Sequence, residues 1–497
     1  MKKKSKTSII FLMTLVILFA FSQIITTNLN FKISEFTDSN FIDNENLKLS
    51  VVSGKIHIIN NWTEARDRGI CTGSGSYSDP YVIEDLEIDG EGRGSCILIG
   101  NSDVFFQIKH CKFYNASSFC DGMICSTHAG IKLYDVSNAQ IVDNDCSYNN
   151  DIGIFLWDCN NNAISGNLIN NNQYGIGIYL WDSNNNTISG NFLNNNQYGI
   201  YISGYSKNTL SGNIMNDCGL KFRVGSHLDQ LRSHDIDTTN LVNGKPLYYY
   251  SDEVFLGSDD FTNAGQVILL NVNDSTISNL YILRASDGIS LYYCNNNTIA
   301  RNIMDNNFED GIFLDSSHNN KISMNNLNNN NNGIFLTESN NNEISTNVVK
   351  NNNRHGIENW FCDNNSFLDN IVSNNVEKGL ALIGENNIIY RNCFIDNGLN
   401  ALDSGSNNYW DNGTKGNYWS DYPGQDEDND GIGDIPYIIA GVAGSQDNFP
   451  LMKFPLPLRG NGEISFELII LISVTSGGAV IGVATLLLIR RKKNRIK

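Results

Sequence analysis

A short motif, Gly-Ile-x-Leu, recurs through the interior of the chain in steps of 22 to 24 residues. A second register, made of single asparagines, follows the same spacing. Its one long step, from Asn213 to Asn279, spans 66 residues, or three times 22, so we expect less regular units to fill this gap. The motif begins at Gly130, Gly153, Gly177, Gly199 (with Ile202 in place of Leu), Gly288, Gly311 and Gly333, and in degenerate form at Gly356 and Gly379; the asparagines are Asn144, Asn167, Asn191, Asn213, Asn279, Asn302, Asn325, Asn347, Asn370 and Asn392.

Each unit holds two or three short strand-like segments separated by asparagine-rich turns, with no room for a helix. In one copy of the motif, strand alternation places Ile312 and Leu314 inward and Phe313 outward. Because one unit cannot bury its apolar face alone, neighbouring units must stack. The sequence therefore predicts an all-β fold: a single-stranded right-handed parallel β-helix, a solenoid of 22–24-residue turns about 4.8 Å apart.

Asparagine suits such a solenoid for two reasons. It tolerates the left-handed backbone conformation of sharp turns, and its amide can hydrogen-bond to the same amide one turn away. The rival is a leucine-rich repeat, which also has units of 20–29 residues. That fold requires a Leu-x-x-Leu-x-Leu frame, and leucine is sparse in these units.

The ends of the chain indicate an external location. Lysines precede an apolar run at the start, and an uncharged run near the end is followed by a basic tail, which the positive-inside rule places in the cytoplasm. We expect a single-pass protein of the cell membrane with an extracellular ectodomain. The expected segments are a signal peptide or N-terminal anchor (1–27), an N-terminal cap (28–80), the β-helix (81–406), a C-terminal cap (407–460), a transmembrane helix (466–489) and a cytoplasmic tail (490–497).

The formal net charge of −19 argues against nucleic acid as a partner, because nucleic-acid binding selects for basic surfaces. Six cysteines precede residue 147. An external location permits disulfides among them, but the sequence does not fix the pairing.

Aromatic residues occupy outward slots of the repeated strand on several turns. Flat rings at the spacing of the turns would stack on the C–H faces of a sugar chain, or contact an envelope protein. The alternative is that the rings only stack on each other and stabilise the fold. The candidate binding residues are Phe155, Tyr179, Tyr201, Trp157, Trp181, Phe313 and Phe335.

Two carboxylates, Asp158 and Asp182, share a slot on adjacent turns where the strand ends. Carboxylates about 5 Å apart suit a retaining glycosidase. A lyase or epimerase would also need a base, and Lys132 is the candidate. A solvated turn is the alternative for the same residues, so whether the chain is an enzyme stays open.

An acidic segment follows the repeats. Asp426, Asp428, Asp430 and Asp434 stand at positions 1, 3, 5 and 9 of a calcium-type loop, where Ile432 would contribute its backbone carbonyl. Position 12 is a tyrosine, so the bidentate glutamate of an EF-hand is missing. We expect structural calcium here, with a solvated acidic turn as the alternative.

The chain resembles the NosD-type periplasmic copper-binding β-helix family, part of the carbohydrate-binding and sugar-hydrolase domains with a pectin-lyase-like fold. The resemblance is carried by the Asn-Asn-x-Ile and Gly-Ile-x-Leu repeats, the segments 243–250 and 264–269, and the tail from Tyr418 to Asp434. It implies the β-helix fold and raises the question of copper. Copper delivery favours clustered Cys, Met or His, whereas the seven histidines are scattered, so we do not expect copper.

These observations lead to one main functional hypothesis. We expect a membrane-anchored surface protein that binds extracellular polysaccharide or an envelope partner without turnover. The alternatives are a polysaccharide lyase, epimerase or glycoside hydrolase acting on the same face, and a NosD-like copper-handling accessory protein.

Overall fold

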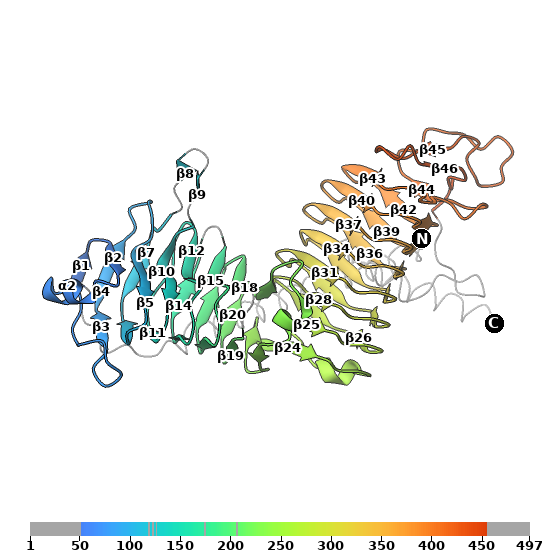
Figure 1. Ribbon diagram of the computed structural model, residues 1–497. Helices are drawn as coiled ribbons and strands as arrows, with labels where there is room; N and C mark the ends of the chain where they lie inside the picture. Colours follow the sequence, from blue (N-terminus) through green and yellow to red (C-terminus); the bar gives the residue numbers. More distant parts are fainter. Residues whose placement is uncertain are drawn as a thin grey trace, which may run out of the picture. The chain divides into compact units, whose positions relative to one another are not determined.

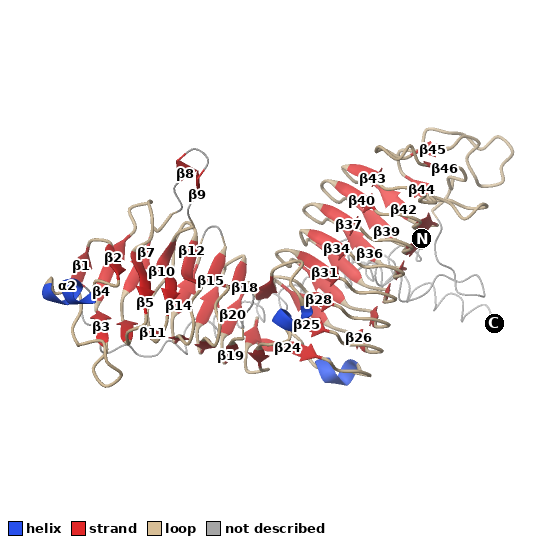
Figure 2. Ribbon diagram, viewed as in Figure 1, coloured by secondary structure: helices blue, strands red, loops and turns tan. Residues whose placement is uncertain are grey.

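A computed structural model describes residues 51–454, apart from 118–119, 122–123, 126, 173–174 and 205–206. Strands and turns make up nearly all of it, with a few short helices (Figure 2). The predicted signal or anchor (1–27), transmembrane helix (466–489) and basic tail (490–497) lie outside the described residues. Within the described part, no helix combines the length and apolar character needed to cross a membrane.

The strands stack turn upon turn in parallel, as the repeat predicts (Figure 1). The repeated motif lies on the longest strand of most turns, and these long strands form two successive stacks. The first stack is β2 (Ile56–Ile59), β5 (Ile97–Ser102), β10 (Ala129–Val136), β12 (Ile152–Trp157), β15 (Ile176–Trp181), β18 (Tyr198–Ser203) and β21 (Leu220–Phe222). The second is β24 (Lys245–Ser251), β25 (Gln266–Leu270), β28 (Ile289–Tyr292), β31 (Asp310–Asp315), β34 (Asn332–Thr337), β37 (His355–Trp360), β40 (Lys378–Ile383) and β43 (Leu399–Asp403).

Two short strands complete each regular turn. The strand that follows the long strand is β3 (Tyr81–Glu84), β6 (Phe106–Lys109), β11 (Ala139–Val142), β13 (Ala163–Ser165), β16 (Thr187–Ser189), β19 (Thr209–Ser211) and β22 (Asp235–Ile236), then β26 (Thr276–Ser278), β29 (Thr298–Ala300), β32 (Lys321–Ser323), β35 (Glu343–Ser345), β38 (Ser366–Leu368) and β41 (Ile388–Tyr390). The third is β1 (Val51–Ser53), β4 (Leu86–Asp89), β7 (Lys112–Tyr114), β14 (Leu168–Asn170), β17 (Phe192–Asn194), β20 (Ile214–Asn216) and β23 (Leu241–Val242), then β27 (Tyr281–Leu283), β30 (Ile303–Asp305), β33 (Asn326–Asn328), β36 (Val348–Lys350), β39 (Ile371–Ser373), β42 (Cys393–Ile395) and β44 (Tyr418–Trp419).

The remaining elements are short. Two antiparallel pairs lie outside the stacks, and three helical segments occur at the start of the described chain and in the segment between the two long-strand stacks. They are β8 (Cys120–Asp121) with β9 (Ile124–Cys125), β45 (Tyr437–Ile438) with β46 (Gln446–Asp447), α2 (Trp62–Asp67), α3 (Leu228–Leu231) and η1 (Ser258–Phe261).

The glycine of the motif is required by the distance between turns. A Cβ atom on Gly311 would lie 2.7 Å from the carbonyl oxygen of Gly333 and 2.8 Å from the side chain of Leu327. Next to it, Ile312 pairs in register with Ile334, and both side chains are fully buried. The motif therefore places a close backbone approach beside a column of stacked core side chains, which contribute roughly 1.5–3 kcal/mol each when fully buried.

Three asparagine ladders hold the turns in register. Each ladder asparagine donates its backbone N–H to the side-chain oxygen of the next one, and most use the side-chain amide to reach that oxygen and a backbone carbonyl of the preceding turn. The columns are Asn144, Asn167, Asn191, Asn213 and Asn240, continued by Asn302, Asn325, Asn347, Asn370, Asn392 and Asn417; Asn162, Asn186 and Asn208, continued by Asn297, Asn320, Asn342, Asn365, Asn387 and Asn408; and Asn149, Asn172 and Asn196, continued by Asn307, Asn330, Asn352, Asn375 and Asn397.

One predicted member of the first column is wrong. Asn279 is exposed and adopts a left-handed turn conformation with φ of 61°. Leu280 occupies the ladder slot instead, and its backbone N–H donates to the side chain of Asn302 at 2.9 Å. The spacing of 66 residues misleads because the segment before it is not built of regular turns.

The two long-strand stacks meet through a glutamine. The side-chain amide of Gln266 accepts from the backbone N–H of Leu220 at 2.9 Å and donates to its carbonyl oxygen at 2.8 Å. Gln266 thus supplies the pair of hydrogen bonds that a backbone strand would make. Residues 223–265, which connect β21 to β25, carry α3, η1 and the antiparallel pair of β23 and β24.

Aromatic side chains cover the last turns, as expected of a cap over an open apolar core. Trp410 and Trp419 are buried. Trp410 donates its indole N–H to Asp403, and Trp419 donates to Asp447, each at 2.9 Å. Asp447 also accepts the backbone N–H of Asn417, so the first ladder ends on a carboxylate, and burial raises the pKa of Asp447 to about 6.

The ladders predict a specific loss of stability. Replacing Asn347 by alanine leaves the backbone N–H of Asn325 and the carbonyl of Ile322 buried without a partner. We expect the free energy of unfolding to fall by about 3 kcal/mol, measured by chemical denaturation. The matched control is Asn353→Ala, whose side chain is exposed and outside the ladders. Equal stability of the two variants would contradict a structural role for the ladder.

Candidate functional site

Five aromatic side chains on the outer face of β12, β15 and β18 form one continuous group, the N-terminal aromatic strip. Phe155 and Tyr179 stack with ring centroids 4.9 Å apart, Trp157 and Trp181 stack at 5.9 Å, and Tyr201 meets Tyr179 edge-on at 5.1 Å. In-register pairing of the strands sets this spacing. The predicted clustering of these five residues on successive turns therefore holds in the structure.

The members of the strip differ in exposure. Phe155 is only 1% exposed, packs with Ala129 and Ile152, and lies below the ammonium group of Lys132 at 5.5 Å. A ligand cannot reach its ring. Trp157 is 46% exposed, and Tyr179, Trp181 and Tyr201 are partly exposed. The accessible surface is therefore the edge formed by the two tryptophans and Tyr179.

A second aromatic group lies on the later turns. Phe313 is fully buried beneath the ammonium group of Lys221, 4.6 Å from its ring. Phe335 is partly exposed and stacks on Trp360 at 6.2 Å, and Trp360 stacks on Phe361 at 5.8 Å. We call Phe335, Trp360 and Phe361 the C-terminal aromatic group. Sequence reasoning missed Phe361, although it directly follows an outward tryptophan.

A buried ion pair lies where the two stacks meet. Lys221 and Asp287 approach to 2.6 Å, with side chains 7% and 1% exposed. Burial alone would lower the pKa of Lys221. The carboxylate of Asp287 more than offsets this and holds the pKa of Lys221 well above its usual value. Asp287 also accepts from the hydroxyl of Ser290 and from the backbone N–H of Asp310. The pair therefore fixes β21 against β28 and β31.

Asp310 is a buried carboxyl in the same cluster. Burial raises its pKa well above the usual value, the nearby charge of Asp287 adds to this, and Lys221 opposes it. Its side-chain oxygen accepts from the amide of Asn332 at 3.0 Å. Burial and the charge of Asp287 therefore both disfavour the charged form of Asp310, whereas Lys221 favours it.

Further along the same face, a histidine lies among charged side chains. His355 is buried, and its Nε2 atom is 3.6 Å from Glu377 and 4.0 Å from Glu358. Burial lowers the pKa of His355 to about 3 and raises that of Glu358. Arg354 lies 3.4 Å from Glu358. This group is adjacent to Phe335, which pairs with Glu358 across the strands.

The predicted base lies apart from the two predicted carboxylates, which occupy equivalent positions on adjacent turns. Asp158 and Asp182 are exposed at corners with left-handed backbone, where their backbone N–H groups pair with the next turn. Lys132 donates to the carbonyl of Thr127, before the start of β10, whereas the aspartates follow the ends of their strands. Burial lowers the pKa of Lys132. The ammonium group and the two carboxylates therefore face opposite ends of the long strands.

The acidic loop gathers three of its four predicted carboxylates. Oxygen atoms of Asp426, Asp428 and Asp430 lie within 4.8 Å of one another. Asp434 lies outside this trio and accepts the backbone N–H of Glu427 at 2.8 Å. The backbone N–H of Ile432 donates to Asp430 at 2.8 Å, which folds the loop around the trio.

Within the described residues, this trio is the one group of His, Cys, Asp or Glu side chains close enough to hold a metal ion. Copper would select thiolate, thioether or imidazole ligands. The nine cysteines outside the pair of β8 and β9 are unpaired and buried, and burial raises their pKa, which keeps the thiols protonated. The described residues therefore do not fit a copper site.

The raised pKa of Asp310 predicts a pH dependence of stability. Below about pH 4 its carboxyl is protonated in both the folded and unfolded states. At higher pH the unfolded chain releases this proton while the folded chain keeps it, so the folded state loses relative stability. Asp310→Asn has no ionisable group at this position and so avoids this loss of stability. The difference in free energy of unfolding between Asp310→Asn and the unsubstituted chain, measured by urea titration, should increase from pH 4 to pH 7 in favour of the variant.

The control for this measurement is Asp259→Asn, at an exposed position. Its stability should follow the pH dependence of the unsubstituted chain. A constant difference between Asp310→Asn and the unsubstituted chain across this range would contradict a neutral buried carboxyl.

Comparisons with known proteins bear on the fold. A family model described as "Periplasmic copper-binding protein (NosD)" matches residues 25–179, 77–253 and 233–424. No curated protein matches the chain significantly. Among solved structures, the periplasmic alginate epimerase AlgG is similar at 16% identity, covering 73% of this chain and 84% of that chain, with a TM-score of 0.29.

Two further structures are similar. The Azotobacter vinelandii mannuronan C-5 epimerase AlgE6 A-module matches at 13% identity over 66% of this chain and 85% of its own, with a TM-score of 0.28. PfbA, a surface adhesin of Streptococcus pneumoniae, matches at 14% identity over 65% and 82%, with a TM-score of 0.25. Likenesses this low assign no functional residue to the present chain.

Proposed function

This chain belongs to the NosD family of β-helix proteins, and on that scaffold we propose that the outer face of its long strands binds an extended polysaccharide without turnover. The observation that carries the proposal is the edge of Trp157, Tyr179 and Trp181. Neighbouring ring centroids in the strip are 4.9 to 6.1 Å apart. The rings of Trp157, Tyr179 and Trp181 remain open to solvent.

Flat aromatic rings offer an apolar surface that matches the C–H faces of sugar rings. Because parallel strands repeat every turn, the strip presents rings at intervals rather than as a single contact, and weak contacts along one polymer add up. The hydrogen-bonded ladders hold the turns in place before binding, so little conformational entropy is lost in the protein.

The location follows from segments outside the described residues. We place the protein on the cell surface, held by the apolar run at 466–489, with the β-helix outside. An external polysaccharide would be accessible to the strip in this arrangement. An envelope protein is the other partner that the same strip could contact.

A glycan-modifying enzyme is the second candidate, and one observation favours it. Glu358 has a raised pKa because of burial and lies beside Phe335 on the outer face, with Arg354 and His355 nearby. A carboxyl whose pKa is raised by burial is better suited to general acid catalysis of glycoside cleavage than a fully solvated one. New reducing ends or unsaturated uronates in the binding assay below, lost in Glu358→Gln, would establish it.

The strip makes a direct prediction for binding. Trp157→Ala with Trp181→Ala should weaken retention of a bound polysaccharide by about tenfold or more, because it removes the exposed stacking surface. Affinity electrophoresis through a panel of polysaccharides measures this. The matched control is Phe192→Ala, an exposed aromatic on β17, away from the strip.

Three outcomes are informative. Retention lost in the double variant but kept in the control supports polysaccharide binding. Unchanged retention in the double variant contradicts the proposed role of the strip. Absence of retention by any polysaccharide, together with capture of a purified envelope protein through the same tryptophans, would make the partner a protein.

We also propose that the acidic loop binds structural calcium. The trio of Asp426, Asp428 and Asp430 supports it, because hard carboxylate oxygens at alternate positions are the ligands that calcium prefers. Removing calcium with EGTA should lower the melting temperature, and Asp428→Asn should abolish that difference. An unchanged melting temperature after chelation would contradict the proposal.

A further inference from the structure

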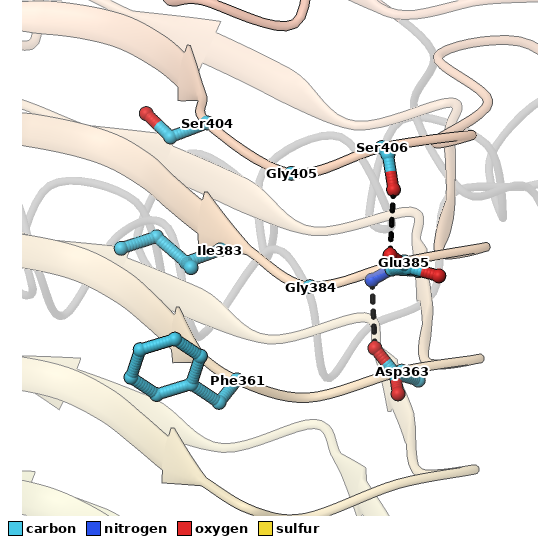
Figure 3. A pocket seen from close by; sticks show the side chains of 8 residues that line it. All are labelled: Phe361, Asp363, Ile383, Gly384, Glu385, Ser404, Gly405 and Ser406. Carbon is cyan, nitrogen blue, oxygen red and sulfur yellow. Dashed lines mark hydrogen bonds between the residues drawn. The ribbon is translucent and has the colours of Figure 1, made fainter.

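A pocket of about 430 Å³ opens at the corner where three successive turns follow β37, β40 and β43 (Figure 3). It lies outside the N-terminal aromatic strip and adjoins the C-terminal aromatic group through Phe361. The side chains that matter are the ring of Phe361 and the polar groups of Asp363, Glu385 and Ser406, which lie along one edge of the pocket.

The backbone of Phe361 is strained. Its backbone has φ of 56°, in the left-handed region that a bulky side chain rarely adopts; the same corner on the three preceding turns holds Glu338, Ser316 and Tyr293, also with positive φ. The ring is 62% exposed, so burial in the core does not compensate. The ring stacks on Trp360 and stays largely exposed, so it offers an apolar surface at the edge of the pocket.

Two glycines keep the pocket open. A Cβ atom on Gly384 would lie 2.0 Å from the carbonyl oxygen of Cys362, and one on Gly405 would lie 1.9 Å from the carbonyl oxygen of Gly384. No larger residue fits at either position, and on the two turns that follow Phe361 the pocket is lined by Ile383 and Ser404 (Figure 3). The hollow is therefore a consequence of the backbone itself.

The carboxylates are held by a ladder of their own. Asp363 accepts the backbone N–H of Glu385 at 2.7 Å, and Glu385 accepts the hydroxyl of Ser406 at 2.8 Å (Figure 3). Each of these two bonds uses one oxygen of its carboxylate. A ring face with two ordered carboxylates beside it matches a sugar that stacks on the ring and donates hydrogen bonds to the acids.

We propose that this corner pocket binds a single residue of a glycan that offers hydrogen-bond donors, hydroxyl or ammonium, and that it rejects uronic acids. The two carboxylates and the net charge of −19 repel a sugar carboxylate. The inference rests on the proposed polysaccharide binding for the class of ligand, but its residues are separate from Trp157 and Trp181.

The test uses the full-length chain and three soluble trisaccharides, built of N-acetylglucosamine, glucosamine or galacturonic acid, in calorimetric titrations. We expect the first two to bind at least about tenfold more tightly than the third. Phe361→Asn should abolish this binding while raising the melting temperature, because asparagine tolerates the left-handed backbone. Glu385→Gln should weaken the glucosamine trimer more than the N-acetylglucosamine trimer.

The matched control is Phe192→Ala, an exposed aromatic on β17 outside both the strip and the pocket, which should leave trisaccharide binding unchanged. If Trp157→Ala with Trp181→Ala loses polymer retention while Phe361→Asn keeps it, the strip and the pocket are separate sites. The inference is overturned if no trisaccharide binds, if galacturonate binds best, or if Phe361→Asn binds like the unsubstituted chain. Trisaccharide binding without any polymer retention would support the pocket and contradict the proposed role of the strip.

Discussion

Hydrogen bonding between one turn and the next is the interaction on which every other feature of this protein depends. A single turn has three short strands and cannot bury its own apolar side chains. The asparagine ladders join neighbouring turns through buried amide groups, and each ladder position leaves two or more backbone groups without partners if it is lost. The turns are therefore stable only together, and their spacing fixes where every outward side chain can lie.

That spacing explains the character of the outer face. Rings in equivalent positions stack automatically, so stacking alone does not identify a binding surface. Accessibility separates the two cases: Phe155 and Phe313 lie under lysine side chains and contribute to packing, whereas Trp157, Trp360 and Phe361 remain open. The same face also carries buried charge, and Lys221 with Asp287 holds two stacks together at a point where the backbone ladder is interrupted.

The sequence was sufficient to predict what repeats. The spacing of Gly-Ile-x-Leu predicted parallel turns, the alternation predicted Ile312 inward and Phe313 outward, and the asparagines predicted a ladder. What it could not predict depends on residues far apart in the chain. Asn279 was assigned to the wrong position because the irregular segment before it shifts the register. The contact between Gln266 and Leu220 was not predictable because a side-chain amide makes the two hydrogen bonds that a backbone strand would make.

The candidate site was less predictable than the fold for the same reason. Outward aromatics were found from their slots, but the covering of Phe155 depends on Lys132 from another turn. The pocket beside Phe361 depends on glycines one and two turns later, and no pattern within a single unit reveals it. Local spacing predicts position, whereas exposure is a property of neighbouring turns.

The ladders also bear on how such a chain can change in length over evolution. Each ladder asparagine meets an identical group on both sides, so a whole turn of 22 or 23 residues can be duplicated or deleted and the bonds at the new boundary are the same as before. Ladder steps of 21 to 25 residues occur in this chain, so the columns also tolerate small differences in length within a turn. The length of the outer face can therefore change in steps of one turn. Homologous proteins can thus bind longer or shorter partners with the same core packing.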